Sequence, residues 1–166
     1  MAIVVMSIQF FPMPDKTYVI KEVAMVDVVS NMEKMLIAKP PCNISVFSAR
    51  HRKTLRYVVD KVHGIPWNVG YMDLEDVEEQ VRKTVDEADL IYIKGLDRVN
   101  FLLNLTGAPV HKIIDLNEIQ NIGKTTERNY SLQCQYNHSR HNKLRCAFEQ
   151  AIRYRDFMRE NYYYRI

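Results

Sequence analysis

Strand-like patterns occupy the beginning of the chain. Residues 3–11 and 18–29 are rich in β-branched and aromatic side chains, which favour extended backbone. The segment 12–15 between them contains two prolines and an aspartate, a composition typical of a hairpin turn. A third run at 34–38 ends before two consecutive prolines. The pattern therefore predicts three antiparallel strands at the start of the fold.

Helical periodicity follows these strands. Apolar residues spaced three and four apart predict a helix over 47–62, which His63 and Gly64 end. Asp73 is a suitable N-cap for a second helix that reaches about residue 86. The chain then alternates between types of segment, with a strand at 90–93, a helix at 97–105, a strand at 110–114, a short helix and a loop within 116–130, and a last helix from 142 to about 160.

This order of segments indicates the fold class. A strand, a helix and a strand in succession imply a parallel pair. We therefore expect a single α/β domain over residues 1–166, with a mixed sheet of about five strands flanked by helices. Its C-terminal helix and a tail rich in tyrosine and arginine occupy residues 142–166. At 166 residues and 47% hydrophobic, the chain is long enough for one core.

Composition indicates where in the cell the protein is located. The chain has no apolar run of about 18 residues and no signal-peptide pattern, so we expect a soluble, intracellular protein of the cytoplasm or nucleus without a membrane partner. Its three cysteines, Cys42, Cys134 and Cys146, form no disulfide framework, which fits a reducing environment. The net charge of +3 says little about partners.

Potential metal ligands lie close together near the C-terminal end. They are Cys134, His138, His141 and Cys146. Thiolate and imidazole are the ligands that zinc prefers, and spacings of a few residues let one turn and one helix start present them to a common point. The alternative interpretation is a pair of small buried thiols beside a surface histidine.

Basic residues gather in two places, one on the helix predicted at 47–62 and one on the last helix and tail. The residues are Arg50, Arg52, Lys53 and Arg56 in the first set, and Arg153 and Arg155, with Tyr163 and Tyr164, in the second. Such cations neutralise phosphates and such rings stack on unpaired bases, so one interpretation is nucleic-acid binding. The alternatives are a solvated helix face for the first set and docking of the last helix for the tyrosines.

Three short motifs resemble those of the DEDDh 3′–5′ exonuclease family, and the resemblance spans nearly the whole chain. The motifs are Val62-His63-Gly64-Ile65, the segment 89–95, and Ser131-Leu132 followed by His141 and Cys146-Ala147. They are similar to the family's His-Gly-Ile motif, to the strand with its second acidic motif, and to the histidine that precedes Asp-Ala at the terminal helix. The resemblance implies a ribonuclease H-like fold.

The departures from that family concern its metal-binding acids. Its exonucleases hold two Mg²⁺ ions with carboxylates, beginning with an Asp-x-Glu pair on the first strand. Here Ser7 and Gln9 stand at those positions, and Cys146 replaces the last aspartate. Asp97, the acid nearest to the second motif, is expected to cap a helix. The sequence therefore predicts that the protein is not a two-magnesium exonuclease.

This replacement of acids is similar to that in Maelstrom domains of the piRNA pathway, which derive from DEDDh enzymes and carry a Glu-Cys-His-Cys zinc set. The resemblance implies a structural zinc held by Glu22, Cys134, His138 and Cys146, with His141 as a substitute for His138. The alternative for Glu22 is a solvated strand residue, and Lys21 beside it is expected on the surface. Flanking segments are also similar to uncharacterised insect and mobile-element proteins of the same lineage.

The expected function is that of a catalytically degenerate, zinc-stapled domain that binds single-stranded RNA or a protein partner. Two alternatives stay open. One is a residual, metal-independent RNA endonuclease, which the Maelstrom resemblance permits. The other is a self-assembling structural protein of viral or mobile-element origin. A shared fold does not choose among them.

Overall fold

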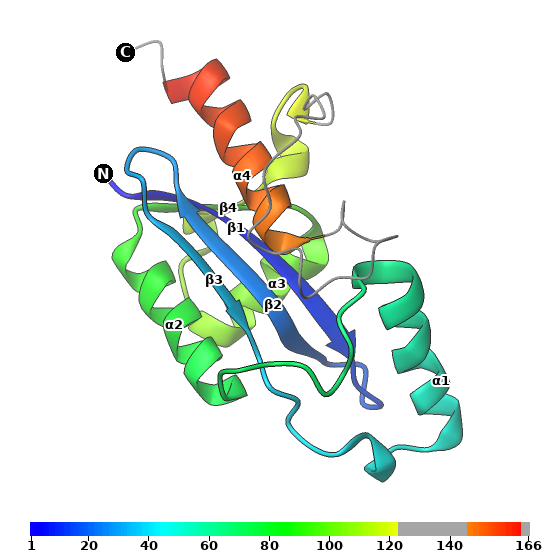
Figure 1. Ribbon diagram of the computed structural model, residues 1–166. Coiled ribbons are helices and arrows are strands. Elements are labelled where there is room, and N and C mark those ends of the chain that lie inside the picture. Colours follow the sequence, from blue (N-terminus) through cyan, green and yellow to red (C-terminus); the bar gives the residue numbers. More distant parts are fainter. Residues whose placement is uncertain (123–145, 164–166) are drawn as a thin grey trace.

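A mixed five-stranded sheet forms the centre of the computed structural model, which describes residues 1–122 and 146–163 (Figure 1). The strands β1 (Ile3–Pro12), β2 (Tyr18–Asp27) and β3 (Glu33–Ile37) are antiparallel neighbours. The strands β4 (Leu90–Ile93) and β5 (Ile113–Asp115) extend the sheet on the other side of β1 and run parallel to it. The order is β3-β2-β1-β4-β5, which confirms the expected α/β class with a five-stranded mixed sheet.

Helices cover both faces of this sheet. In Figure 1 the sheet runs diagonally, with α2 (Leu74–Glu87) on one side and α1 (Ala49–Val58) and α4 (Ala147–Met158) on the other. The helix α3 (Leu96–Thr106) joins β4 to β5 and packs in the same core as α2. Shorter turns are the 3₁₀ segments η1 (Ile44–Val46), η3 (Val110–Lys112) and η4 (Leu116–Glu118), and the π segments η2 (Val59–His63) and η7 (Arg159–Tyr163). No described helix is long and apolar enough to cross a membrane.

Alternation along β1 decides which helix contacts which residue. Ile3 and Val5 point to the core shared with α4, whereas Met6 and Ile8 point to the core shared with α2 and α3. Phe11, on the same face as Val5, packs with residues of α1. Both α1 and α4 therefore lie on the face formed by the odd-numbered residues of β1.

A β-bulge interrupts the pairing of β1 and β2 at Lys21. Gln9 pairs with Glu22 and Phe10 with Ile20, so Lys21 is an extra residue without an opposite partner on β1. Its side chain is only 2% exposed, which shows that the expectation of a surface position was wrong. The ammonium group donates hydrogen bonds to the carbonyls of residues 38, 67 and 69, and these acceptors make its burial possible.

Several boundaries differ from the expectations. The helix predicted at 47–62 begins after Ser48, whose side chain accepts a hydrogen bond from the His51 N–H, and its last turn is the π segment η2. The strand predicted at 110–114 starts only at Ile113, because η3 precedes it. The region predicted as a short helix and a loop at 116–130 begins with η4, and its residues 123–130, like residues 142–145 of the predicted last helix, lie outside the described part of the chain.

Candidate functional site

Three polar residues interrupt the apolar sheet face beneath the start of α4. Ser7 and Gln9 of β1 and Glu22 of β2 are 5%, 3% and 0% exposed. Ser7 and Gln9 share a face because successive side chains of a strand alternate, and register places Gln9 opposite Glu22. Polar side chains at this depth require hydrogen-bonded or charged partners.

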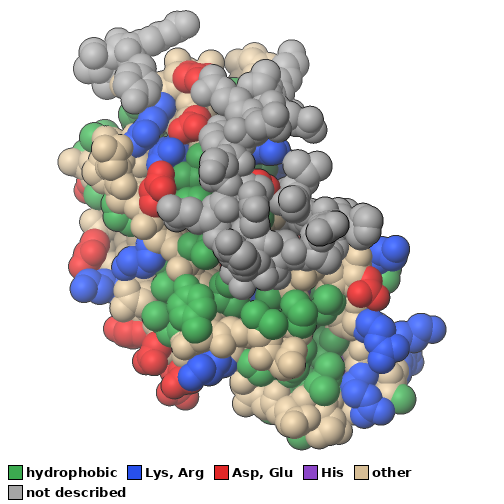
Figure 2. Space-filling view, in the orientation of Figure 1, with side chains coloured by type: hydrophobic (Ala, Val, Ile, Leu, Met, Phe, Trp, Pro, Cys, Tyr) green, Lys and Arg blue, Asp and Glu red, His purple; other side chains and the backbone are tan. Residues whose placement is uncertain are grey.

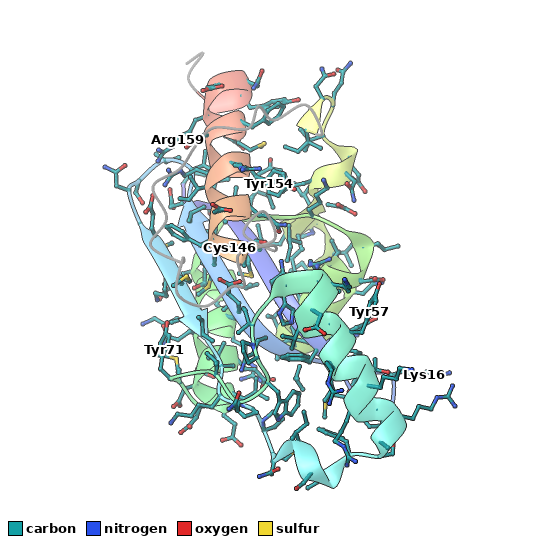
Figure 3. All side chains as sticks on the ribbon, turned by 45° about the vertical axis from the view of Figure 1, so that its right-hand side comes forward. Lys16, Tyr57, Tyr71, Cys146, Tyr154 and Arg159 are labelled. Carbon is teal, nitrogen blue, oxygen red and sulfur yellow. The ribbon has the colours of Figure 1, made fainter. Side chains whose placement is uncertain are left out.

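The first turn of α4 contacts Glu22 directly. Cys146 Sγ lies 3.5 Å from Glu22 Oε1, and the Ala147 backbone N–H donates to Glu22 Oε2 at 3.0 Å. In Figure 3, Cys146 lies at the end of α4 nearest the middle of the sheet. The carboxylate also benefits from the partial positive charge of the helix N-terminus. The structure thus brings two of the four predicted zinc ligands together.

The geometry of this pair is compatible with a shared zinc ion. Bond lengths of about 2.0 Å to oxygen and about 2.3 Å to sulfur at a tetrahedral angle separate the two ligand atoms by about 3.5 Å. That matches the observed distance between Glu22 Oε1 and Cys146 Sγ, 3.5 Å. The other predicted ligands, Cys134, His138 and His141, lie outside the described residues. Within residues 1–122 and 146–163, no three His, Cys, Asp or Glu side chains gather as a metal site.

Ser7 connects β1 to α4 without any charge. Its hydroxyl donates to Gln150 Oε1 at 3.0 Å. The Gln150 amide carries an acceptor oxygen and a donor NH2 group, so this contact needs no charge at position 7. The contact therefore joins β1 to α4 through two neutral side chains.

His63 has a structural position. It is fully buried, its Nδ1 accepts a hydrogen bond from the Ile65 N–H at 3.1 Å, and its Nε2 lies 3.2 Å from the Phe10 carbonyl. Since Nδ1 is an acceptor, Nε2 carries the proton and donates to Phe10, which defines a neutral tautomer. The ring also meets Phe11 edge-on, with centroids 4.8 Å apart. This part of the His-Gly-Ile-like motif fixes the end of η2 to β1.

The basic residues of α1 form an exposed stripe. Arg50, Lys53 and Tyr57 lie on one side of the helix and are exposed, with Tyr57 at 62%. Arg56 is exposed beside them, and Arg52 is half-buried with its Nη1 donating to the Phe47 carbonyl at 2.7 Å. Figure 2 shows Lys and Arg side chains gathered over α1 and hydrophobic side chains next to them, and Figure 3 shows Tyr57 on the outer side of the helix.

A pocket of about 710 Å³ lies along α1 on the side of Leu55 and Val59, which is roughly opposite Tyr57 on the helix. Its lining includes Pro40, Leu55, Val59, Pro66 and Trp67, together with the arginines Arg52 and Arg56. The Trp67 Nε1–H donates to the Cys42 carbonyl at 3.0 Å, and the indole meets Phe11 and Phe47 edge-on. These contacts fix the position of the Trp67 ring, which forms part of the apolar wall, and the two arginines add positive charge to the lining.

The second predicted basic set has a different environment. Arg155 is 8% exposed, and its guanidinium is paired with Glu33 of β3 and with Asp156 at 3.2 Å. The Tyr163 hydroxyl lies 3.2 Å from the Tyr92 hydroxyl, and Arg153 is half-buried. Tyr164 is outside the described residues. Arg155 and Tyr163 therefore have a structural role in fastening the last helix to the sheet, and their contact with a nucleic acid stays a prediction.

Two basic residues near Ser7 were missed by the sequence interpretation. Lys94 follows β4 directly, and Arg98 lies in the first turn of α3, where its Nε donates to the Ile8 carbonyl at 2.9 Å. Neither residue belongs to a run of basic residues. The available signal was their place after a parallel strand, since binding sites of α/β sheets form outside the carboxyl ends of such strands.

Comparisons with known proteins add no family to this description. The chain matches no protein-family model, and no curated protein matches it. The function of the site therefore follows only from its residues and their geometry.

Proposed function

We propose that the protein is a nucleic-acid-binding module that holds single-stranded RNA on the outer side of α1 and in the adjoining pocket. The observation that carries this proposal is the apolar pocket of about 710 Å³ with Arg52 and Arg56 among its lining residues, on a helix that also exposes Arg50, Lys53 and Tyr57. An unpaired nucleotide offers the complementary pair of groups, a flat base and a phosphate.

Charge supports a polyanionic ligand at this surface. Residues 49–59 contain the four cations Arg50, Arg52, Lys53 and Arg56 and no acidic residue. Among the described residues, none of these side chains forms an ion pair. Cations that are not neutralised internally can neutralise phosphates, and an exposed ring such as Tyr57 can stack on a base.

The architecture supports a ribonuclease H-like domain. Three antiparallel strands followed by two parallel ones, in the order β3-β2-β1-β4-β5, are what the resemblance to DEDDh exonucleases implies. At the positions similar to that family's first acids the sheet presents Ser7 and Gln9. We infer a domain that has lost two-metal catalysis and kept the ability to bind nucleic acid.

A structural zinc ion would fasten this domain internally. Glu22 and Cys146 would hold it together with Cys134 and either His138 or His141. The support is the 3.5 Å separation of the carboxylate oxygen and the sulfur, and the complete burial of Glu22. Four protein ligands leave no open position for an activated water, so the ion would supply folding stability and no catalysis.

The test is RNA binding measured by fluorescence anisotropy over a range of salt concentrations. The wild-type protein should bind single-stranded RNA with a steep salt dependence. Lys53→Gln and Arg56→Gln should each reduce the slope by about 0.7 for every phosphate that the variant no longer neutralises. Tyr57→Ala should weaken binding by about 1–3 kcal/mol if its ring stacks on a base. Lys83→Gln is the matched control, because Lys83 is an exposed lysine on α2, in the other layer.

Two outcomes would overturn the proposal. One is RNA binding with the same salt slope in Lys53→Gln, Arg56→Gln and Lys83→Gln. The other is an absence of RNA binding together with a mass that rises with protein concentration in light scattering, which would favour a self-assembling protein.

A further inference from the structure

A second, polar pocket lies beside Ser7, between the middle of β1, the C-terminal end of β4 and the first turns of α4. Its volume is about 330 Å³. Its lining includes Ser7, Lys94, Arg98, Asn117, Gln150 and Tyr154. Two of these side chains are cationic, the other four are neutral hydrogen-bonding groups, and no carboxylate is among the lining residues.

Both cations are held in place by contacts that leave their charge unpaired. Arg98 donates from Nε to the Ile8 carbonyl at 2.9 Å, and its guanidinium lies over the Phe10 ring, 5.6 Å from the centroid. Lys94 Nζ lies 5.5 Å from the centroid of the Tyr154 ring. Neither side chain forms an ion pair with a carboxylate of residues 1–122 or 146–163.

Partial burial of Arg98 makes binding of an anion more favourable. Desolvation lowers the pKa of the Arg98 guanidinium, although Asp97 and two tyrosines act in the opposite direction. A guanidinium remains charged nonetheless, because arginine is not deprotonated in proteins. A half-buried cation of this kind gains more from a bound anion than a solvated surface cation does.

The backbone at Gly95 shapes the wall of the pocket. Gly95 has φ of 103°, and a Cβ added to it would lie 3.5 Å from Arg98 Nη1. The nearby carboxylate of Asp115 is occupied, since its Oδ1 accepts from the backbone N–H groups of Gly95 and Asn117, both at 2.9 Å. Asp115 therefore fixes the two loops that border the pocket and is not one of the residues that line it.

We propose that this pocket binds a phosphate group, with Arg98 and Lys94 as its cationic ligands and Ser7, Gln150, Asn117 and Tyr154 as hydrogen-bonding partners. The planar, fixed guanidinium can contact two phosphate oxygens at once, and the ammonium adds a second charge. The ligand class is a phosphomonoester or inorganic phosphate. The site is thus opposite in charge to one that holds divalent metal ions.

The position of the pocket suggests a source for the phosphate. Ser7 and Phe11 lie on the same face of β1, and four residues of a strand span about 13 Å. Phe11 lies under α1, so the pocket and the proposed RNA surface are on one side of the sheet. The terminal phosphate of a bound RNA strand could therefore enter the pocket, an extension that rests on the proposed function. Binding of inorganic phosphate does not depend on it.

The first arm of the test uses inorganic phosphate and the full chain. Titration followed by amide NMR shifts should move the signals of residues around the pocket. Lys94→Gln should weaken phosphate binding by about tenfold or more, as expected for loss of a charge-assisted hydrogen bond. Ser7→Asp should abolish binding, and Lys83→Gln on α2 should leave it unchanged. Lys94 is half-buried and has no hydrogen bond with a described residue, so its replacement is compatible with folding even if Ser7→Asp is not.

The second arm compares RNA strands of one sequence that end in a phosphate or in a hydroxyl group. Preference for a terminal phosphate that disappears in Lys94→Gln but persists in Arg56→Gln would identify RNA as the source. Phosphate binding without such a preference would support the pocket and indicate a small phosphorylated ligand. If phosphate fails to bind, or binds equally well to Lys94→Gln and Ser7→Asp, the phosphate pocket is wrong. RNA binding through α1 could still hold in that case, so the two proposals fail separately.

Discussion

Lys21 carries a charged group into the interior of the protein. Its ammonium group is buried and donates to three backbone carbonyls, two of them in the segment that links η2 to α2. A protonated amine has three N–H groups, so all three donors are used. Burial lowers the pKa of Lys21 to about 8, which leaves the group mostly charged at neutral pH. The residue therefore ties β2 to a segment that has little regular structure of its own.

Replacing this residue tests both its hydrogen bonds and its titration. Lys21→Met should lower the free energy of unfolding by at least about 2 kcal/mol, because three buried carbonyls lose their donor. The pKa is about 8 in the folded chain and about 10.4 in the unfolded chain, so the unfolded chain binds more protons between these values. Wild-type stability should therefore rise from about pH 8 to about pH 9.5. Urea unfolding across this range should show the rise in the wild-type protein and none in Lys21→Met; a flat wild-type profile would contradict the lowered pKa.

Among the elements, β2 and α4 meet at the contact of Glu22 with Cys146 and Ala147. If zinc is bound there, metal removal should loosen the first turn of α4, while the apolar contacts of Ala151 and Ile152 continue to hold the rest of the helix on the sheet. Protein purified without added zinc should contain about one zinc ion per chain, and chelation should lower the melting temperature. Cys146→Ser should lose the metal, whereas Cys42→Ser should retain it, since Cys42 lies in the apolar pocket beside α1.

Metal content distinguishes a ligand from a buried thiol. A merely structural role of Cys146 would lower the melting temperature of Cys146→Ser without changing the zinc content. Zinc absent from the wild-type protein would exclude the ion outright. Loss of zinc in His141→Ala but not in His138→Ala would identify His141 as the ligand.

The sequence predicted the elements well where their pattern is local. The strands at β1, β2 and β4 and the helices α1, α2 and α3 were expected within a few residues of their observed bounds, because apolar periodicity reports directly on a buried face. The bulge at Lys21 was missed, because it depends on how β1 and β2 pair and does not change the pattern of apolar and polar residues along β2.

The candidate site was predictable only in part, for the same physical reason. Residue chemistry pointed to Glu22 and Cys146, and the structure brings them together. Clusters of basic residues predicted nucleic-acid binding equally for α1 and for the last helix, yet Arg155 forms an intramolecular ion pair with Glu33. Lys94 and Arg98 come together with Ser7 only through the parallel pairing of β1 and β4. Such meetings of distant segments cannot be read from spacing along one segment.

Across the whole molecule, both pockets described on the face of the sheet under α4 and α1 include two cationic side chains among their lining residues. At its centre Ser7 and Gln9 are neutral, and Lys94 and Arg98 stand beside them. At one end, Arg52 and Arg56 border the apolar pocket. Cations at both pockets favour phosphates, and Glu22 is the one carboxylate described beside Ser7 and Gln9, whereas a two-metal nuclease requires several.

We therefore expect no magnesium- or manganese-dependent exonuclease activity from the intact protein. Two divalent ions need several carboxylate ligands, whereas Ser7 and Gln9 supply no negative charge and two cations adjoin Ser7. The measurement is the length of a 5′-labelled single-stranded oligonucleotide after incubation with either ion, with Glu22→Ala as the paired variant. Progressive shortening from the 3′ end that stops with EDTA and is lost in Glu22→Ala would overturn this expectation. Cleavage that continues in EDTA would leave it intact and identify the metal-independent endonuclease as an additional activity of the domain.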